Sequence, residues 1–403
     1  MAPPEERNNN HAVKKRFLAP DVARGLMLLS IALANVVMAW APAGEAMAAA
    51  GLGGIRDGSV ADKITVVLGT MFVHVRGLPM FSTLLGFGVG MISLSLLRRG
   101  YPRGKAQAVL AKRYAWLYLF GLIHMTFLFF GDIMLGYGLC GLVLTLFIGL
   151  SNKTLMWIAG VIWAVAAALN FGMGLFRGEP FVLASSYGEY VLNGLSMVFG
   201  ATLAAPLMYS ALLPPMIVGL LMARTLMLHE VPAHRRGLKI WAAIAFAFIL
   251  LVGLPWGLAE IGVLPASWTT PLYALNQAAG FITGPGLVAA IALAVQPAQR
   301  RWDREGSMNP AIYSLVALGK RSMSGYVAQS VVFFVVILPF TLNIAEGMGA
   351  TGKSLIAVGV WAVTVALAVL LERFGVSGPL EKLHRRLSYG KQGLQKQWAP
   401  QKN

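Results

Sequence analysis

The chain is poor in charged residues, and acidic residues are the scarcest of them. Only 12% of its 403 residues are charged, and 16 acidic residues stand against 33 basic ones. A soluble domain carries about 25% charged residues, so this composition excludes an ordinary soluble protein. Because 57% of the residues are hydrophobic and the mean hydropathy is +0.68, the sequence predicts an all-α polytopic membrane protein.

The sequence also has little that could hold a metal or a permanent cofactor. Its one cysteine, Cys140, lies in an apolar stretch, which excludes an intrachain disulfide and disfavours a thiolate metal site. It contains no HExxH or CxxC spacing and no G-x-S-x-G elbow. Gly86, Gly88 and Gly90 follow no predicted strand, so close helix packing explains them better than a phosphate loop. We therefore expect neither a metal centre nor a permanently bound cofactor.

Windows of about 20 apolar residues predict ten transmembrane helices. A further apolar stretch, 64–78, is too short to cross alone and reads as interfacial or re-entrant. These features divide the chain into a basic N-terminal tail over 1–20, a membrane domain over 21–373 and a basic amphipathic tail over 374–403. The predicted spans are 22–41, 79–97, 114–130, 133–150, 154–173, 204–223, 240–258, 272–295, 323–343 and 354–372.

The distribution of Lys and Arg predicts the orientation. With a cytoplasmic N-terminus, 27 basic residues fall inside and five outside, leaving out Arg24 within the first span. Cytoplasmic loops of membrane proteins carry such an excess, so both termini are predicted to be cytoplasmic. We therefore attribute the net charge of +17 to the orientation of the chain in the membrane and to attraction to anionic lipid headgroups, not to binding of nucleic acid. In the tail, Leu380, Leu383 and Leu387 share one helical face that suits the inner leaflet, although a solvated basic tail is the alternative.

One histidine and one aspartate lie in the apolar stretch 121–144, and they are the sharpest functional signal in the chain. A titratable group in hydrocarbon is costly unless it is paired, so it marks a functional hypothesis. His124 is predicted near mid-depth, where an imidazole could take and return a proton, and Asp132 could orient it. The alternatives are that His124 only bonds a neighbouring helix and that Asp132 only caps the following helix. Tyr137, in the same stretch, is a candidate substrate contact.

Three further polar groups are candidates for a site. Asp21 and Arg24 lie one turn apart at the inner start of the first span, and with Arg113 they could hold the phosphates of a donor. The alternative for Asp21 and Arg24 is a helix cap beside a snorkelling arginine. His74 and Arg76 precede the second span near the outer surface and could edge an outward pocket, or be ordinary interfacial residues. The ninth span opens with unusual polarity and could line a pathway or join helices, through Ser324, Tyr326 and Gln329.

Five segments, in this order, resemble the landmarks of the bacterial YeiB-like membrane proteins. The resemblance covers nearly the whole chain and implies a multi-pass protein of the bacterial plasma membrane. It does not bring a settled activity with it. The segments are DVARGLMLLSIALAN, FSTLLGFGVG, GLIHMTFLFFGDIMLGYGLCGLVL, GKRSMSGYVAQS and GPLEKLHRRLSYG.

The D-x-x-R-G start of the first span is also similar, more distantly, to transmembrane acyltransferases of the acyltransferase-3 and heparan-glucosaminide acetyltransferase types. That similarity implies transfer of an acyl group from a cytoplasmic thioester, such as acetyl-coenzyme A, to a sugar or lipid at the other face. Arg24 matches their inner-face arginine. Their membrane histidine would be His124 or His74, and the first span offers only Asn35 where acyltransferase-3 proteins usually have a histidine.

The leading hypothesis is therefore an acyltransferase that modifies an envelope glycan or glycolipid. A second hypothesis is an exporter of a small or lipidic solute with His124 and Asp132 as a proton relay. A third is a scaffold whose polar residues only pack helices. The predicted partners are membrane lipids and the acceptor, with a second copy of the chain as a further candidate.

Overall fold

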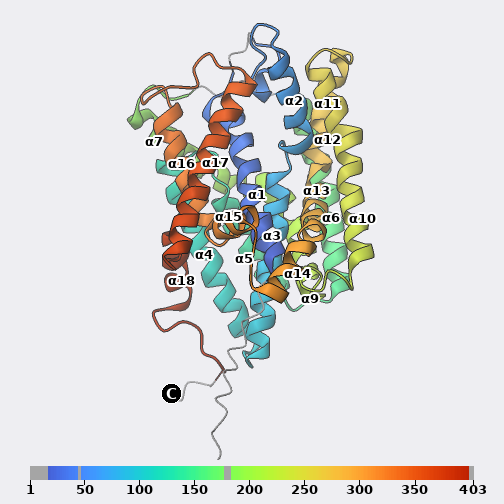
Figure 1. Ribbon diagram of the computed structural model, residues 1–403, viewed down its shortest axis with the longest axis vertical. Coiled ribbons are helices and arrows are strands. Elements are labelled where there is room, and N and C mark those ends of the chain that lie inside the picture. Colours follow the sequence, from blue (N-terminus) through green and yellow to red (C-terminus); the bar gives the residue numbers. More distant parts are fainter. Residues whose placement is uncertain (1–16, 44–46, 177–182, 399–403) are drawn as a thin grey trace, which may run out of the picture.

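The computed structural model describes residues 17–43, 47–176 and 183–398, and within these ranges the chain folds into α-helices without a β-strand (Figure 1). The helices are α1 (Leu18–Asn35), α2 (Val60–Phe72), α3 (Gly77–Arg98), α4 (Arg103–Phe127), α5 (Met134–Phe147), α6 (Asn152–Leu175), α7 (Tyr187–Leu203), α8 (Ala205–Tyr209), α9 (Leu213–Arg224), α10 (Arg235–Phe248), α11 (Leu254–Glu260), α12 (Thr269–Ala279), α13 (Thr283–Ala294), α14 (Gln296–Glu305), α15 (Pro310–Gly319), α16 (Ser322–Ile337), α17 (Ala350–Arg373) and α18 (Pro379–Tyr389).

The all-α polytopic architecture predicted from composition is confirmed. Seven helical stretches among the described residues are long and apolar enough to cross a bilayer, and each overlaps a predicted span. The other three predicted spans correspond to α4, α5 and α16, which are shorter or more polar. The total of ten crossings and the cytoplasmic termini remain predictions. The seven stretches are Leu18–Trp40, Val60–Arg98, Asn152–Leu175, Ala205–Arg224, Arg235–Glu260, Ala266–Ala294 and Ala350–Arg373.

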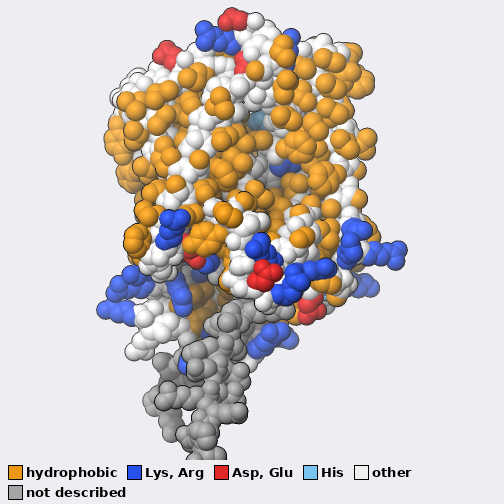
Figure 2. All heavy atoms as spheres, in the orientation of Figure 1, with side chains coloured by type: hydrophobic (Ala, Val, Ile, Leu, Met, Phe, Trp, Pro, Cys, Tyr) orange, Lys and Arg blue, Asp and Glu red, His pale blue; other side chains and the backbone are white. Residues whose placement is uncertain are grey.

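Charged side chains gather at one end of the molecule, below a broad apolar surface (Figure 2). We call this the basic end; it carries the loop before α4, the start of α10, α14 and α18. At the opposite end lies α2, which the sequence predicted as interfacial or re-entrant. A stripe on α2 is exposed, as expected for contact with lipid, through Val60, Ile64, Leu68 and Phe72.

One apolar helix, α7, lies where the sequence predicted only a connection. Tyr190 near its start donates to the carbonyl of Leu128 at 2.8 Å, and Thr202 near its end lies 3.5 Å from the hydroxyl of Tyr118. α7 therefore runs antiparallel to α4, and α8 and α9 continue the chain to the basic end. Polar residues in the first two turns of α7 dilute its apolar signal, which explains why a hydropathy window missed it.

Two glycines let α3 and α9 pack with their backbones in contact. A Cβ on Gly86 would lie 1.8 Å from the carbonyl oxygen of Met216, and one on Gly219 would lie 1.9 Å from that of Thr83. Small residues at such crossings are what allows helices to associate in a bilayer, where there is no hydrophobic driving force between them. The helix-packing role predicted for Gly86 is confirmed, and α3 becomes the centre around which α1, α4, α5 and α13 pack.

A buried carboxylate joins α2 to α17 at the end opposite the basic end. Asp62 in the first turn of α2 accepts a hydrogen bond from the amide of Thr351, in the first turn of α17, at 2.8 Å. Its other oxygen accepts from the amide of Arg56 at 3.1 Å. Asp62 thus satisfies an amide that the start of α17 leaves without an intrahelical partner.

We expect Gly219→Ala to destabilise the protein, because the added methyl group meets a backbone carbonyl that cannot move away. Overpacking of this kind destabilises by roughly 1–3 kcal/mol. The matched control is Gly160→Ala on α6, where a Cβ would meet nothing within 4 Å. Thermal unfolding in detergent should show a lower midpoint for Gly219→Ala and an unchanged or higher one for Gly160→Ala. Equal midpoints for the two variants would contradict this account of the crossing.

Candidate functional site

The buried pair His124 and Asp132 forms a hydrogen-bonded dyad. His124 lies in the last turn of α4, and Asp132 lies in the turn that leads to α5. The His124 Nδ1 to Asp132 Oδ1 distance is 2.7 Å, and the two side chains are 4% and 0% exposed. The second carboxylate oxygen, Oδ2, accepts from the amide of Leu135 at 2.7 Å. The sequence left two alternatives for Asp132: orienting His124 or capping the following helix. The two oxygens of Asp132 make both contacts.

This geometry leaves one nitrogen of the dyad available. With the carboxylate ionised, Asp132 can only accept, so the Nδ1–H of His124 donates to it and Nε2 carries the lone pair. His124 Nε2 is buried and has no hydrogen-bond partner in the described part of the chain. A buried nitrogen that is oriented by a carboxylate and left without a partner is suited to accept a proton.

The sequence of the hairpin explains why the two residues meet. A Cβ on Gly121 would lie 2.1 Å from the amide nitrogen of Leu135, so only glycine allows α5 to begin this close to α4. α4 ends at Phe127, and Leu128 and Phe129 both donate their amides to the carbonyl of His124. The chain then turns back and places Asp132 beside the imidazole.

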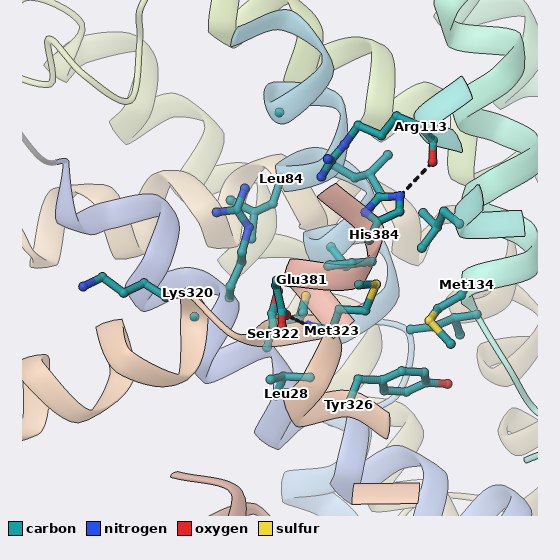
Figure 3. A pocket seen from close by; sticks show the side chains of 18 of the residues that line it. Leu28, Leu84, Arg113, Met134, Lys320, Ser322, Met323, Tyr326, Glu381 and His384 are labelled. Carbon is teal, nitrogen blue, oxygen red and sulfur yellow. Dashed lines mark hydrogen bonds between the residues drawn. The ribbon is translucent and has the colours of Figure 1, made fainter. Parts of the chain in front are cut away.

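A cavity of about 450 Å³ lies at the basic end, and we call it the inner cavity (Figure 3). Arg24, Met27, Leu28 and Ile31 all line it, so it follows two turns of α1, roughly 10 Å along the helix. Its basic side is formed by Arg24, Arg113, Lys320 and Arg385. Its apolar side includes Leu84, Leu117, Ile133, Met134 and Tyr326.

Tyr326 separates the inner cavity from His124. It lines the cavity, and its ring centroid lies 5.2 Å from that of His124. Its hydroxyl, like His124 Nε2, is buried without a hydrogen-bond partner among the described residues. Buried polar groups without a partner are unusual, because leaving such groups unpaired is costly.

A second cavity of about 550 Å³ lies toward the opposite end, and we call it the outer cavity. Asn35, His74, Phe129 and Gln277 are among its lining residues. Phe129 lies 6.2 Å from the ring of His124. His124 and Asp132 themselves line neither cavity, and the imidazole packs near a wall residue of each, Tyr326 of the inner cavity and Phe129 of the outer cavity.

The two cavities are close to each other. Ile31 and Ile133 line both of them, so at this point the barrier between the cavities is one side chain thick. Beside this barrier the end of α1 widens into a π-helix over Val36–Trp40. Single π-turns of this kind occur frequently at functional sites, and here Val37, Met38 and Ala39 line the outer cavity.

The three residues predicted to hold a donor lie together on the inner cavity. Asp21 and Arg24 are ion-paired at 3.3 Å, and Arg113 lies on the facing helix α4. The Arg113 guanidinium donates to the hydroxyl of Tyr389 at 3.3 Å. The site therefore combines the first, fourth and last helices of the described chain, which no local sequence pattern indicates.

His74 and Arg76 take different positions. His74 is buried, lines the outer cavity and packs edge-on against Trp256. Arg76 is also buried but does not line that cavity. Its guanidinium donates to the carbonyls of Thr70, Met71 and Val75, so it holds the turn between α2 and α3.

The other predicted substrate contacts lie between helices. Tyr137 donates to the carbonyl of Leu78 at 2.8 Å, and Gln329 donates to that of Leu28 at 3.4 Å. Ser324 donates to Glu381. None of these three residues lines the inner or the outer cavity. Of this group, only Tyr326 faces a cavity.

α18 forms one wall of the inner cavity, and its contribution was missed from the sequence. Glu381 accepts from the amides of Met323 at 2.8 Å and Ser324 at 3.1 Å, so it caps the start of α16 from another helix. A Cβ on Gly378 would lie 2.0 Å from this carboxylate, so glycine leaves room for it. His384 Nε2 donates to the carbonyl of Arg113 at 2.8 Å (Figure 3). The signal available in the sequence was that Glu381 is the only acid in an otherwise basic segment.

Together, the fold and the buried site define an α-helical polytopic membrane protein. Residues 222–391 match the family described as "Protein of unknown function (DUF418)", and this match fits the YeiB-like resemblance of the motifs. The match includes α16 and α18 but not the dyad. The chain is also similar to the "Uncharacterized protein YxaH" of Bacillus subtilis (strain 168), with 26% identity over 364 residues, 82% of this chain and 83% of the relative.

The α18 contact should make stability pH-dependent. Burial, assisted by the charge of Arg113, lowers the pKa of His384 from 6.5 to about 4. The unfolded chain therefore binds a proton that the folded chain does not between these pH values. Stability is full above pH 6.5 and falls toward pH 4, by up to about 1.4 kcal/mol per pH unit.

Unfolding midpoints measured from pH 7.5 to 4 will test this. His384→Gln, whose amide can donate the same hydrogen bond without titrating, should show a shallower fall than the wild type. His234→Ala removes a histidine that lines neither cavity and should leave the slope unchanged. An identical slope in wild type and His384→Gln would refute the assignment.

Proposed function

We propose that the protein is an acyltransferase of the bacterial plasma membrane. It moves an acyl group from a coenzyme A thioester at the basic end to a hydroxyl or amine of an envelope glycan or lipid that enters the outer cavity. The observation that carries this proposal is that His124 of the buried dyad packs against a wall residue of each of two cavities that reach toward opposite ends. A reaction across the membrane needs a base at this place.

The inner cavity suits a donor with an anionic head and a long apolar arm. Arg24, Arg113, Lys320 and Arg385 supply cations at its basic side, where phosphates would bind. The acyl arm would lie along Leu84 and Leu117 toward Tyr326. Small-molecule sites have about 300–1,000 Å³, and this cavity, at about 450 Å³, lies within that range.

In the proposed reaction His124 acts as general base. Nε2 accepts the proton of the acceptor hydroxyl as its oxygen attacks the thioester carbonyl. The carbon–sulfur bond breaks, and the imidazolium returns the proton to the leaving sulfur, so coenzyme A departs as the free thiol. Asp132 holds the imidazole and stabilises its charged form. The side chain of Tyr326 or of Ile133 must move for the reactants to reach Nε2. His74, on the outer cavity, is the rival base.

We expect His124→Ala to lower acyl transfer by roughly 10²- to 10⁴-fold, the usual contribution of a general base. The assay follows labelled acetyl-coenzyme A and envelope fractions, with the thiol released as a second readout. Asp132→Asn should lower activity strongly at nearly normal stability. An asparagine can still accept from Leu135, but its NH₂ donates to Nδ1 and shifts the histidine proton to Nε2.

His234→Ala is the control for removing a histidine, and it should transfer normally. If His74→Ala abolishes transfer while His124→Ala retains it, the base is His74. Full activity of Asp132→Asn would rule out the orienting role. Unchanged envelope acylation in both histidine variants, at normal protein levels, would sink the enzyme proposal.

The second candidate is a proton-coupled exporter, and the thin barrier at Ile31 and Ile133 favours it. Two cavities with a thin shared wall are what alternating access requires, and a buried His–Asp pair can relay protons. Proton-coupled solute flux in liposomes, without thiol release from the thioester, would select this function over the enzyme.

A further inference from the structure

A third pocket, of about 890 Å³, lies beside α18 and adjoins the inner cavity. We call it the basic groove. Of the α18 residues, His384 and Tyr389 line only the cavity, Lys382 and Arg386 line only the groove, and Glu381 and Arg385 line both. The groove is lined by Lys320, Arg321, Glu372, Gly375, Val376, Ser377, Gly378, Glu381, Lys382, Arg385, Arg386, Gly390, Lys391, Gln392 and Gly393.

Both carboxylates of the groove are already engaged by the protein. Glu372 is ion-paired with Lys320 and with Arg321. Both oxygens of the Glu381 carboxylate accept hydrogen bonds from the start of α16. Among the described residues, neither carboxylate therefore forms an ion pair with the cations that α18 and the following turn bring to the groove.

Four cations are left without an acidic partner. Lys382, Arg385, Arg386 and Lys391 line the groove and form no ion pair within the described chain. The groove is also lined by Gly375, Gly390 and Gly393, where a Cβ would meet nothing within 4 Å.

The positive-inside rule accounts for the sign of these charges but not for their arrangement. That rule concerns only how many Lys and Arg lie in a loop. Apart from the inner cavity and the groove, the described charges at the basic end lie on single helices or in local pairs. Arg301 is paired with Glu305 of its own helix, and Arg235, Arg236 and Lys239 lie along a single helix.

We propose that the basic groove binds a phosphate-bearing polyanion with at least two phosphate groups. Four uncompensated cations around one pocket match several negative charges better than one, and arginine forms paired hydrogen bonds with phosphate oxygens. The ligand is either the headgroup of an anionic lipid or a free polyphosphate. Arg385 lines both the groove and the inner cavity, but Lys382, Arg386 and Lys391 do not line the inner cavity, so these three can be replaced without changing the proposed donor site.

The test uses the full chain in two arms. In the first arm, inorganic tripolyphosphate is titrated by calorimetry into protein held in nanodiscs of neutral phosphatidylcholine. In the second, protein extracted from vesicles of phosphatidylcholine and cardiolipin is examined by native mass spectrometry for retained cardiolipin. The variant carries Lys382→Gln, Arg386→Gln and Lys391→Gln, and the matched control carries Arg235→Gln, Arg236→Gln and Lys239→Gln. All six side chains are exposed, so both variants should fold, and both remove the same charge.

The groove variant should weaken binding by on the order of 100-fold, about fivefold for each cation, and the control by less than twofold. Loss confined to the first arm identifies a free polyphosphate, and loss confined to the second identifies a lipid headgroup. Loss in both arms identifies a site that accepts either. Equal weakening by the two triple variants, or no binding by the wild type in either arm, would overturn the proposal.

Discussion

The carboxylate of Asp132 is the interaction on which the centre of this protein depends. A carboxylate buried among apolar side chains needs partners for both oxygens. One oxygen is satisfied by His124 and the other by the first turn of α5. With the carboxylate ionised, the same group closes the α4–α5 hairpin, orients the imidazole and leaves Nε2 without a partner among the described residues. A substitution of Asp132 therefore separates the contact with His124 from the contact with α5 only if it replaces one oxygen at a time.

The same solution recurs at two other helix starts. Asp62 accepts from the first turn of α17, and Glu381 accepts from the first turn of α16. In each case the acid lies outside the helix that it serves, and Asp62 and Glu381 come from distant parts of the chain. Helix starts buried in apolar surroundings lack water to satisfy their amides. This accounts for three of the few acidic residues: they join elements together while their charge is offset by helix amides.

The sequence was sufficient for the all-α membrane fold class and for seven predicted spans that overlap long apolar helices, because hydropathy reports directly on the bilayer. It also singled out His124 and Asp132, since polar groups in an apolar run are conspicuous. It could not indicate that Arg113 would meet His384, or that Ile31 and Ile133 would share a barrier, because these contacts join helices far apart in the chain. Arg76 illustrates the converse case: a buried arginine looks functional in the sequence, yet its partners are the carbonyls of its own turn.

The dependence of the inner cavity on α18 has a consequence for biosynthesis. The other walls of the cavity come from α1, α3, α4, α5 and α16, with the turn before α16, and all of these precede α18 in the chain. A nascent protein can insert those helices while the cavity still lacks its wall and α16 still lacks its cap. The site is therefore completed only after α18 has left the ribosome and docked against α4 and α16. A ribosome that stops after α17 would release a protein with an inserted bundle and an open, unfinished site.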